Sequence, residues 1–149
     1  MQKPQYAIQS FVEKYSDQDW KSYEVSGPCV IFGKTLHCEP DGESFIVAIH
    51  NGLALENCLP QISGYINWLG FECKNDLIAF YNAHVAAGNS ARADDAWYEA
   101  LEIYGVKIYV DKDAKLSADI AFGDTHFPDH ILDVSVNEHQ FCGDIGLDG

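Results

Sequence analysis

Apolar and polar residues alternate through the last third of the chain, and no other feature constrains the fold as strongly. Residues 105–110 read GVKIYV, 116–122 read LSADIAF, 130–136 read HILDVSV and 140–147 read QFCGDIGL. Alternate residues of a strand face opposite sides of a sheet, so these runs predict four strands, each with one buried face. The DKDA segment and residues 137–140 are then expected to be turns between them.

The rest of the chain predicts one hairpin and three or four helices. Two β-rich runs within residues 28–52 flank Asp41–Gly42, a dipeptide that tolerates the positive φ of a tight turn. Elsewhere apolar residues recur every three or four positions, which is the spacing of an amphipathic helix. These helical segments are 4–15, 60–70, 75–85 and 93–104.

The order of these segments predicts the fold class. Helical and strand segments are grouped rather than alternating, which is typical of α+β proteins. We therefore expect a mainly antiparallel sheet, made of an N-terminal hairpin and four C-terminal strands, covered by three to four helices. With 149 residues and no linker or repeat, the chain is expected to form a single α+β domain over 1–149.

A large negative charge limits the partners that this chain can bind. Its 23 acidic and 9 basic residues give a net charge of −14 at pH 7. Nucleic-acid binding depends on lysine and arginine to neutralise phosphates, so no nucleic acid is expected as a partner. The same field attracts a cationic protein and speeds its association. The alternative, a structural module whose acidity only keeps it in solution, stays open.

Nothing in the sequence predicts secretion or a membrane span. The first residues, MQKPQYAIQSFVEKY, carry charges and amides where a signal peptide has an apolar run. No stretch reaches the ~20 apolar residues that a membrane helix needs. The five cysteines form no CxxC pair and are expected to be small buried side chains in a reducing compartment. A cytoplasmic location is therefore expected.

Several acidic residues fall where strand or helix geometry brings them together. In the C-terminal strands they alternate with apolar residues, so they should gather on one face of the sheet. In the helix expected over 93–104 they recur at i, i+4 and i+7, which places them in one row. We predict that these carboxylates contact a cationic protein partner: Asp95, Glu99, Glu102, Asp119, Asp133, Asp144 and Asp148.

Histidines near the carboxyl end offer a second interpretation. His126 and His130 flank Pro128 in the segment HFPDH, and His139 and Cys142 follow. Their spacing matches neither a zinc knuckle nor the HExxH pair of a helix. The chain also contains no GxSxG, phosphate-binding or dinucleotide-binding motif. A small metal-binding protein or enzyme is therefore the alternative, and no catalytic residue, metal ligand or cofactor is predicted.

The chain is small, acidic and α+β in pattern, and its last residues read FGDTHFPDHILDVSVNEHQFCGDIGLDG. In these respects it resembles the immunity proteins of bacterial toxin–immunity systems. The resemblance implies a non-enzymatic inhibitor that binds a cognate toxin domain, often a cationic nuclease, and covers its active site. Because such proteins share no common binding motif, the resemblance assigns no role to a single residue.

Overall fold

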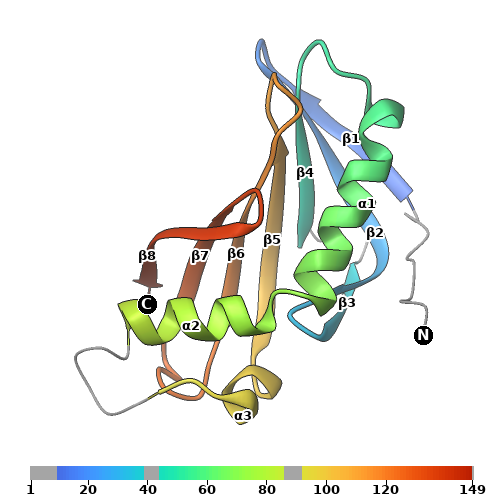
Figure 1. The fold of residues 1–149 in the computed structure, drawn as a ribbon. Helices are drawn as coiled ribbons and strands as arrows, with labels where there is room; N and C mark the ends of the chain where they lie inside the picture. The colour runs from blue at the N-terminus through green and yellow to red at the C-terminus, as the bar shows by residue number, and fades with distance from the viewer. Residues whose placement is uncertain (1–9, 39–43, 86–91, 149) are drawn as a thin grey trace.

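The computed structural model describes residues 10–38, 44–85 and 92–148 (Figure 1). Within these ranges the helices are α1 (Leu55–Phe71), α2 (Lys74–His84) and α3 (Asp95–Glu99). The strands are β1 (Ser10–Ser16), β2 (Trp20–Ile31), β3 (Lys34–Cys38), β4 (Phe45–His50), β5 (Glu102–Val110), β6 (Leu116–Gly123), β7 (Ile131–Asn137) and β8 (Gln140–Asp148). No helix in the described ranges has the length and apolar character needed to cross a membrane.

Seven of the strands form a continuous sheet in the order β1-β2-β4-β5-β6-β7-β8. Neighbouring strands are antiparallel except β4 and β5, which are parallel. Parallel neighbours require a long crossover, and here α1, α2 and α3 all lie within it. β3 stands outside this order and pairs with residues 27–31 of β2.

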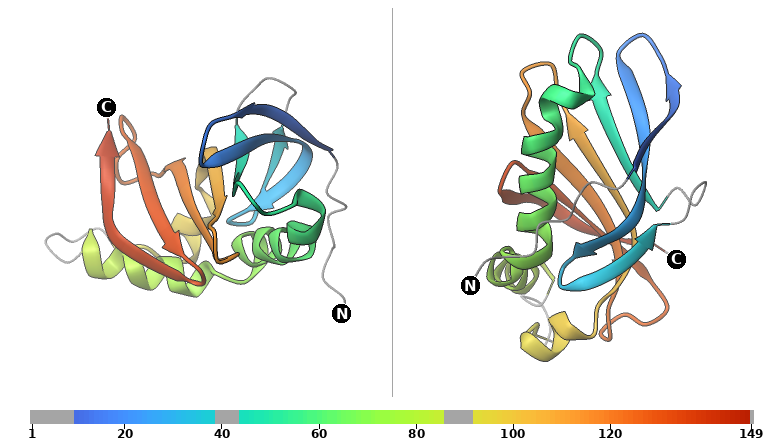
Figure 2. Two further views of the ribbon diagram at one scale, coloured as in Figure 1. Left: turned by 90° about the horizontal axis from the view of Figure 1, so that it is seen from above. Right: turned by 90° about the vertical axis from the view of Figure 1, so that its right-hand side faces the viewer.

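The hydrophobic core lies between the helices and one face of the sheet. Figure 2 shows α1 and α2 on the same side of the curved sheet. Val106, Ile120 and Val134 stand opposite one another on β5, β6 and β7 and are at most 4% exposed. Leu69 of α1 and Leu77 of α2 are fully buried in the same cluster. The strand alternation read from the sequence therefore supplies one wall of the core.

A backbone joint fixes α1 against the turn between β2 and β3. The turn residues Phe32 and Gly33 have φ of 50° and 74°. Their N–H groups donate to the carbonyls of Leu69 and Gly70 at 2.8 and 2.9 Å, at the helix end where intrahelical donors are lacking. A Cβ on Gly70 would lie 2.5 Å from the carbonyl oxygen of Val30, so this close approach requires glycine.

The α+β class and the mainly antiparallel sheet are confirmed, whereas the predicted division of the sheet is only partly right. The helices expected at 60–70 and 75–85 correspond to α1, which begins earlier, and to α2. The four expected C-terminal strands correspond to β5–β8. The N-terminal part, however, contributes more strands than one hairpin, and it joins the C-terminal strands through the parallel pair β4–β5.

The helix expected over 4–15 is wrong where the structure describes it, because residues 10–16 form β1. The apolar spacing of Phe11, Val12 and Tyr15 fits a helix, but β1 pairs with β2 along most of its length. Phe11 packs edge-on against Tyr23, with ring centroids 6.4 Å apart. Tertiary pairing has therefore overridden a local pattern. Residues 4–9 lie outside the described part of the chain.

The turn expected at Asp41–Gly42 also lies outside the described residues. The runs on either side of it do not pair with each other in the described part of the chain. Instead β3 pairs with β2, through a turn at Phe32–Gly33, and β4 lies between β2 and β5. The hairpin expected from Asp41–Gly42 is thus corrected to a β2–β3 hairpin one segment earlier.

The helix expected over 93–104 is also wrong beyond Glu99. Helix α3 spans five residues, and Glu102 already begins β5. A helix of about twelve residues is marginal by itself, whereas β5 gains hydrogen-bonded neighbours on both sides, β4 and β6. Consequently Asp95, Glu99 and Glu102 do not form one helical row.

Candidate functional site

The face of β5–β8 that is turned away from the helices, called here the outer face, carries two strand carboxylates side by side. Asp119 on β6 stands opposite Lys107 on β5 and Ser135 on β7. The Ser135 hydroxyl donates a hydrogen bond to Asp119 Oδ1 at 2.8 Å. Asp133 precedes Ser135 by two residues on β7, so its side chain faces the same way. The pairing of β6 with β7 thus places both carboxylates on the outer face.

Glu102 reaches the same face because it belongs to a strand. It stands opposite Gly123 of β6. The hydroxyl of Tyr104 donates to Glu102 Oε2 at 2.9 Å, and this hydrogen bond raises the pKa of the Tyr104 phenol. A Cβ on Gly123 would lie 2.6 Å from the Tyr104 hydroxyl oxygen, so the ring lies over this glycine. Glu102 and Tyr104 therefore extend the outer face towards the start of β5.

Two large apolar side chains are exposed beside these carboxylates. Tyr104 is 49% exposed and Ile131 is 45% exposed. Ile131 and Asp133 lie two residues apart on β7, on either side of the fully buried Leu132, and so point outward together. Large side chains of this kind serve as anchors in protein interfaces. Neither exposed side chain was predicted from the sequence, although the alternation that places Leu132 inward also places Ile131 outward.

The last strand, β8, carries the other two predicted carboxylates, Asp144 and Asp148. β8 contains an irregularity opposite residues 133–135, where Gly143 has φ 73°. Asp144 follows this glycine and is exposed, but the irregularity interrupts the simple alternation that assigned it to a face. The backbone of Asp148 pairs with Ile131, and the side chain of Asp148 lies outside the described part of the structure.

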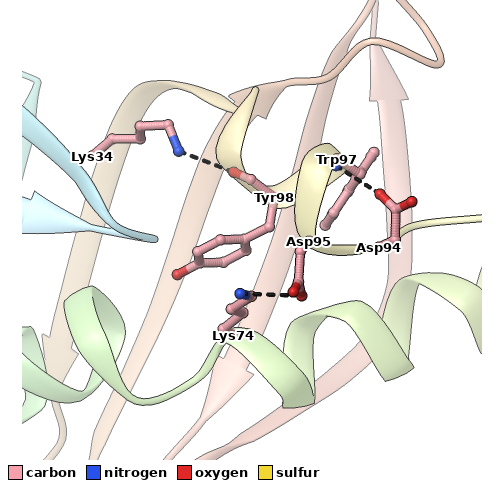
Figure 3. Close-up of polar contacts among 6 residues, drawn as sticks. All are labelled: Lys34, Lys74, Asp94, Asp95, Trp97 and Tyr98. Carbon is pink, nitrogen blue, oxygen red and sulfur yellow. Dashed lines mark hydrogen bonds and ion pairs between the residues drawn. The ribbon is translucent and has the colours of Figure 1, made fainter.

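Around α3, Asp95 lies near Lys74, and the backbone of Tyr98 lies near Lys34 (Figure 3). Lys74 Nζ is 3.1 Å from Asp95 Oδ1. Lys34 donates to the carbonyl oxygen of Tyr98 at 3.0 Å. Burial lowers the pKa of Lys34, and the Glu99 carboxylate partly offsets this effect. These two carboxylates therefore belong to a patch of mixed charge around α3, separate from the outer face.

The histidines near the carboxyl end do not form one group. His126 Nδ1 is hydrogen-bonded to the hydroxyl of Tyr81 on α2 at 2.9 Å. His139 lies instead in the turn between β7 and β8 and packs on Trp68 of α1, with ring centroids 4.7 Å apart. His130 is exposed. Within the described residues no three His, Cys, Asp or Glu side chains are grouped so that they could hold a metal ion.

A buried carboxylate holds the segment between β6 and β7 in place. Asp124 is 7% exposed. Its Oδ2 accepts a hydrogen bond from Trp97 Nε1, and its Oδ1 accepts one from the N–H of Phe127, both at 2.9 Å. Burial and, next, the charge of Asp124 raise the pKa of Tyr81. Asp124 thus fixes this segment to α3 through Trp97 and stabilises the turn of the segment itself through Phe127, which is a structural role.

Comparison with protein-family models, with curated proteins and with solved structures gives no match to this chain. The surfaces of the molecule are therefore the source of information on its function. Of the surfaces described above, the outer face is the one that combines carboxylates with exposed large apolar side chains.

Proposed function

We propose that this protein is a non-enzymatic binding protein that attaches to a cationic partner protein through the outer face. The observation that supports this proposal is the position of Tyr104 and Ile131, exposed on the same face as Glu102, Asp119 and Asp133. The apolar side chains supply the apolar surface that is buried on binding. The carboxylates around them supply charge selectivity.

The charge on this face favours a basic partner. Lys107 is the one lysine or arginine within strands β5–β8, and its ammonium group lies 5.3 Å from the ring centroid of Tyr109. The carboxylates therefore outnumber the cations on this face. A surface of one sign raises the association rate of an oppositely charged protein, and it disfavours acidic competitors.

We further propose that the partner is a toxin domain and that binding neutralises it. A nuclease must hold phosphates with lysine and arginine, so its active site is cationic and complementary to an acidic face. The size and charge of the chain, which resemble those of immunity proteins, support this choice of partner. The protein would then act by covering the toxin rather than by chemistry of its own.

Co-expression of this protein with the product of the reading frame next to its own gene tests this function. If that frame encodes a toxin, this chain should restore growth of cells that express it. The triple variant Glu102→Gln, Asp119→Asn, Asp133→Asn should bind the purified toxin about tenfold more slowly at low salt, since steering is lost. The double variant Tyr104→Ala, Ile131→Ala should mainly speed dissociation, because it removes the anchors.

A matched control removes the same charge from other surfaces. Glu13, Glu56 and Asp76 are exposed on β1, α1 and α2. Their neutralisation to Gln, Gln and Asn should leave association nearly unchanged. Equal slowing by both triple variants would mean that only net charge matters. No rescue of growth by the unaltered chain would contradict the toxin proposal.

A further inference from the structure

A groove separate from the outer face lies beside helix α1. It has a volume of about 920 Å³ and lies between α1 and the turns that join β5 to β6 and β7 to β8. Figure 1 shows the β7–β8 turn close to the C-terminal half of α1. The groove is within the size range of ligand sites and is open along one side. Its lining includes Gln61, Tyr65, Trp68, Glu138, His139 and Gln140.

The floor of the groove is aromatic and fixed in place. Tyr65 and Trp68 are three residues apart on α1, and their rings are nearly parallel, at 9°, with centroids 6.0 Å apart. The hydroxyl of Tyr65 donates to the carbonyl oxygen of Glu138 at 2.6 Å, which ties the floor to the β7–β8 turn. The exposed imidazole of His139 lies across both rings, 5.8 Å from Tyr65 and 4.7 Å from Trp68. The aromatic floor of the groove therefore already carries one stacked planar group, the imidazole of His139.

The rim of the groove is more acidic than basic. Glu72 and Glu138 line it together with one cation, Lys115. Glu138 is exposed and sits in the two-residue turn beside Tyr65. Its carboxylate adds to the effect of burial in raising the pKa of Tyr65, so its charge acts on the groove floor. Aromatic faces beside a carboxylate attract cations, and a planar cation can stack on the ring while it pairs with the carboxylate.

We propose that this groove binds the arginine side chain of a peptide segment from a partner protein. The guanidinium takes the place of the exposed His139 imidazole over Trp68 and donates to the Glu138 carboxylate. Arginine suits the site better than lysine because a flat guanidinium can stack and form paired hydrogen bonds at once. The open side of the groove leaves room for the peptide backbone. This site goes beyond the proposed function, because it uses no residue of the outer face.

Titration with a blocked arginine tests the proposal directly. The probe is N-acetyl-arginine N-methylamide, and the matched probe is the neutral citrulline analogue of the same shape. The indole N–H resonance of Trp68, assigned with the Trp68→Phe variant, should shift saturably with the arginine probe. The resonance of Trp97, which is 3% exposed in the core, should stay in place. Free arginine, which has charged groups where the blocked probe has amides, distinguishes a free amino acid from a peptide segment, and it should bind no more tightly than the blocked probe. Tighter binding of free arginine would overturn the assignment to a peptide segment.

Carboxylate variants make the assignment specific. Glu138→Gln should weaken binding of the arginine probe about fivefold, whereas Glu56→Gln, which removes the same charge from the other end of α1, should not. The outer-face triple variant should also bind the probe normally, so failure here is distinguishable from failure of the proposed function. Equal binding of arginine and citrulline probes, no shift of Trp68, or equal effects of the two glutamate variants would overturn the proposal.

Discussion

The four cysteines whose side chains the structure describes differ in their surroundings. Cys73 is fully buried, and its thiol donates to the carbonyl of Leu69 at 3.4 Å. Burial raises the pKa of Cys73 to about 12. Cys142 is instead half-buried, opposite Ser135 on the outer face. Thiol reagents react with the thiolate. Cys73 is therefore protected in two ways, because it is buried and because its raised pKa keeps the thiol protonated.

We predict that thiol labelling of the folded protein reaches Cys142 first. The test uses a Cys38→Ser background, since the side chain of Cys38 lies outside the described part. At pH 8 Cys73 carries about a thousandfold less thiolate than an unperturbed cysteine, from a pKa shift of 9.0 to about 12. Cys29 and Cys58, which are 5% and 3% exposed, should also label slowly. Peptide mass spectrometry after brief treatment reports each site. Labelling of Cys73 as fast as Cys142 would contradict this arrangement.

At the scale of secondary-structure elements, local periodicity predicts some elements and not others. The alternation in 116–122 and 131–136 predicts β6 and β7, because the pattern of buried and exposed positions is contained in the strand itself. The strand character of residues 10–16 depends on pairing with residues 21–26. The start of β5 depends likewise on residues 122–123 of β6. Pairing with strands far away in the chain leaves no pattern in a short stretch of sequence. The helical spacing of the same residues therefore leads to a wrong prediction of helix.

The joint between α1 and the β2–β3 turn gives a sharp test at this scale. Helix α1 contains two glycines with different surroundings. A Cβ on Gly64 meets nothing within 4 Å, whereas a Cβ on Gly70 meets the carbonyl oxygen of Val30 at 2.5 Å. Glycine in a helix costs about 1 kcal/mol relative to alanine. Replacing each of these glycines by alanine should therefore change the free energy of unfolding in opposite directions.

We predict that Gly64→Ala raises the free energy of unfolding by up to about 1 kcal/mol. Gly70→Ala should instead lower it by about 1–3 kcal/mol, because the helix must move away from β2 or lose its hydrogen bonds to the turn. Urea denaturation of both variants measures the difference. If Gly70→Ala were as stable as Gly64→Ala, the helix end would not be held by the turn at Phe32–Gly33.

At the scale of the whole molecule, the sequence predicts the amount of charge but not its distribution. The net charge of −14 is a property of composition. Which carboxylates share a surface depends on how strands far apart in the chain pair. Pairing of β5 with β6 brings Glu102 to the outer face, although helical spacing grouped it with Asp95 and Glu99. The lysines that lie near Asp95 and Glu99 come from β3 and α2, which no local pattern connects to α3.

Three buried tyrosines make the stability of the whole fold sensitive to alkaline pH. Tyr65, Tyr81 and Tyr98 are at most 6% exposed, and burial is the largest cause that raises the pKa of each. In the unfolded chain tyrosines titrate near pH 10. Below that pH both states keep their protons, and the stabilisation is fully present. Above it the unfolded chain releases protons first, so the free energy of unfolding falls as the pH rises towards the folded pKa values.

We predict that each of these tyrosines lowers the free energy of unfolding by up to about 1.4 kcal/mol per pH unit above pH 10. Tyr98→Phe removes one of the three titrating hydroxyls. The free energy of unfolding of this variant should change with pH as that of the unaltered protein does up to pH 10, and should fall less steeply above pH 10. Lys34, whose pKa burial lowers, is present in both proteins, so the difference between their curves reports mainly on Tyr98. Urea denaturation at pH 8, 10 and 11.5, followed by tryptophan fluorescence, measures both slopes. Identical slopes above pH 10 would mean that Tyr98 releases its proton without unfolding, which its burial argues against.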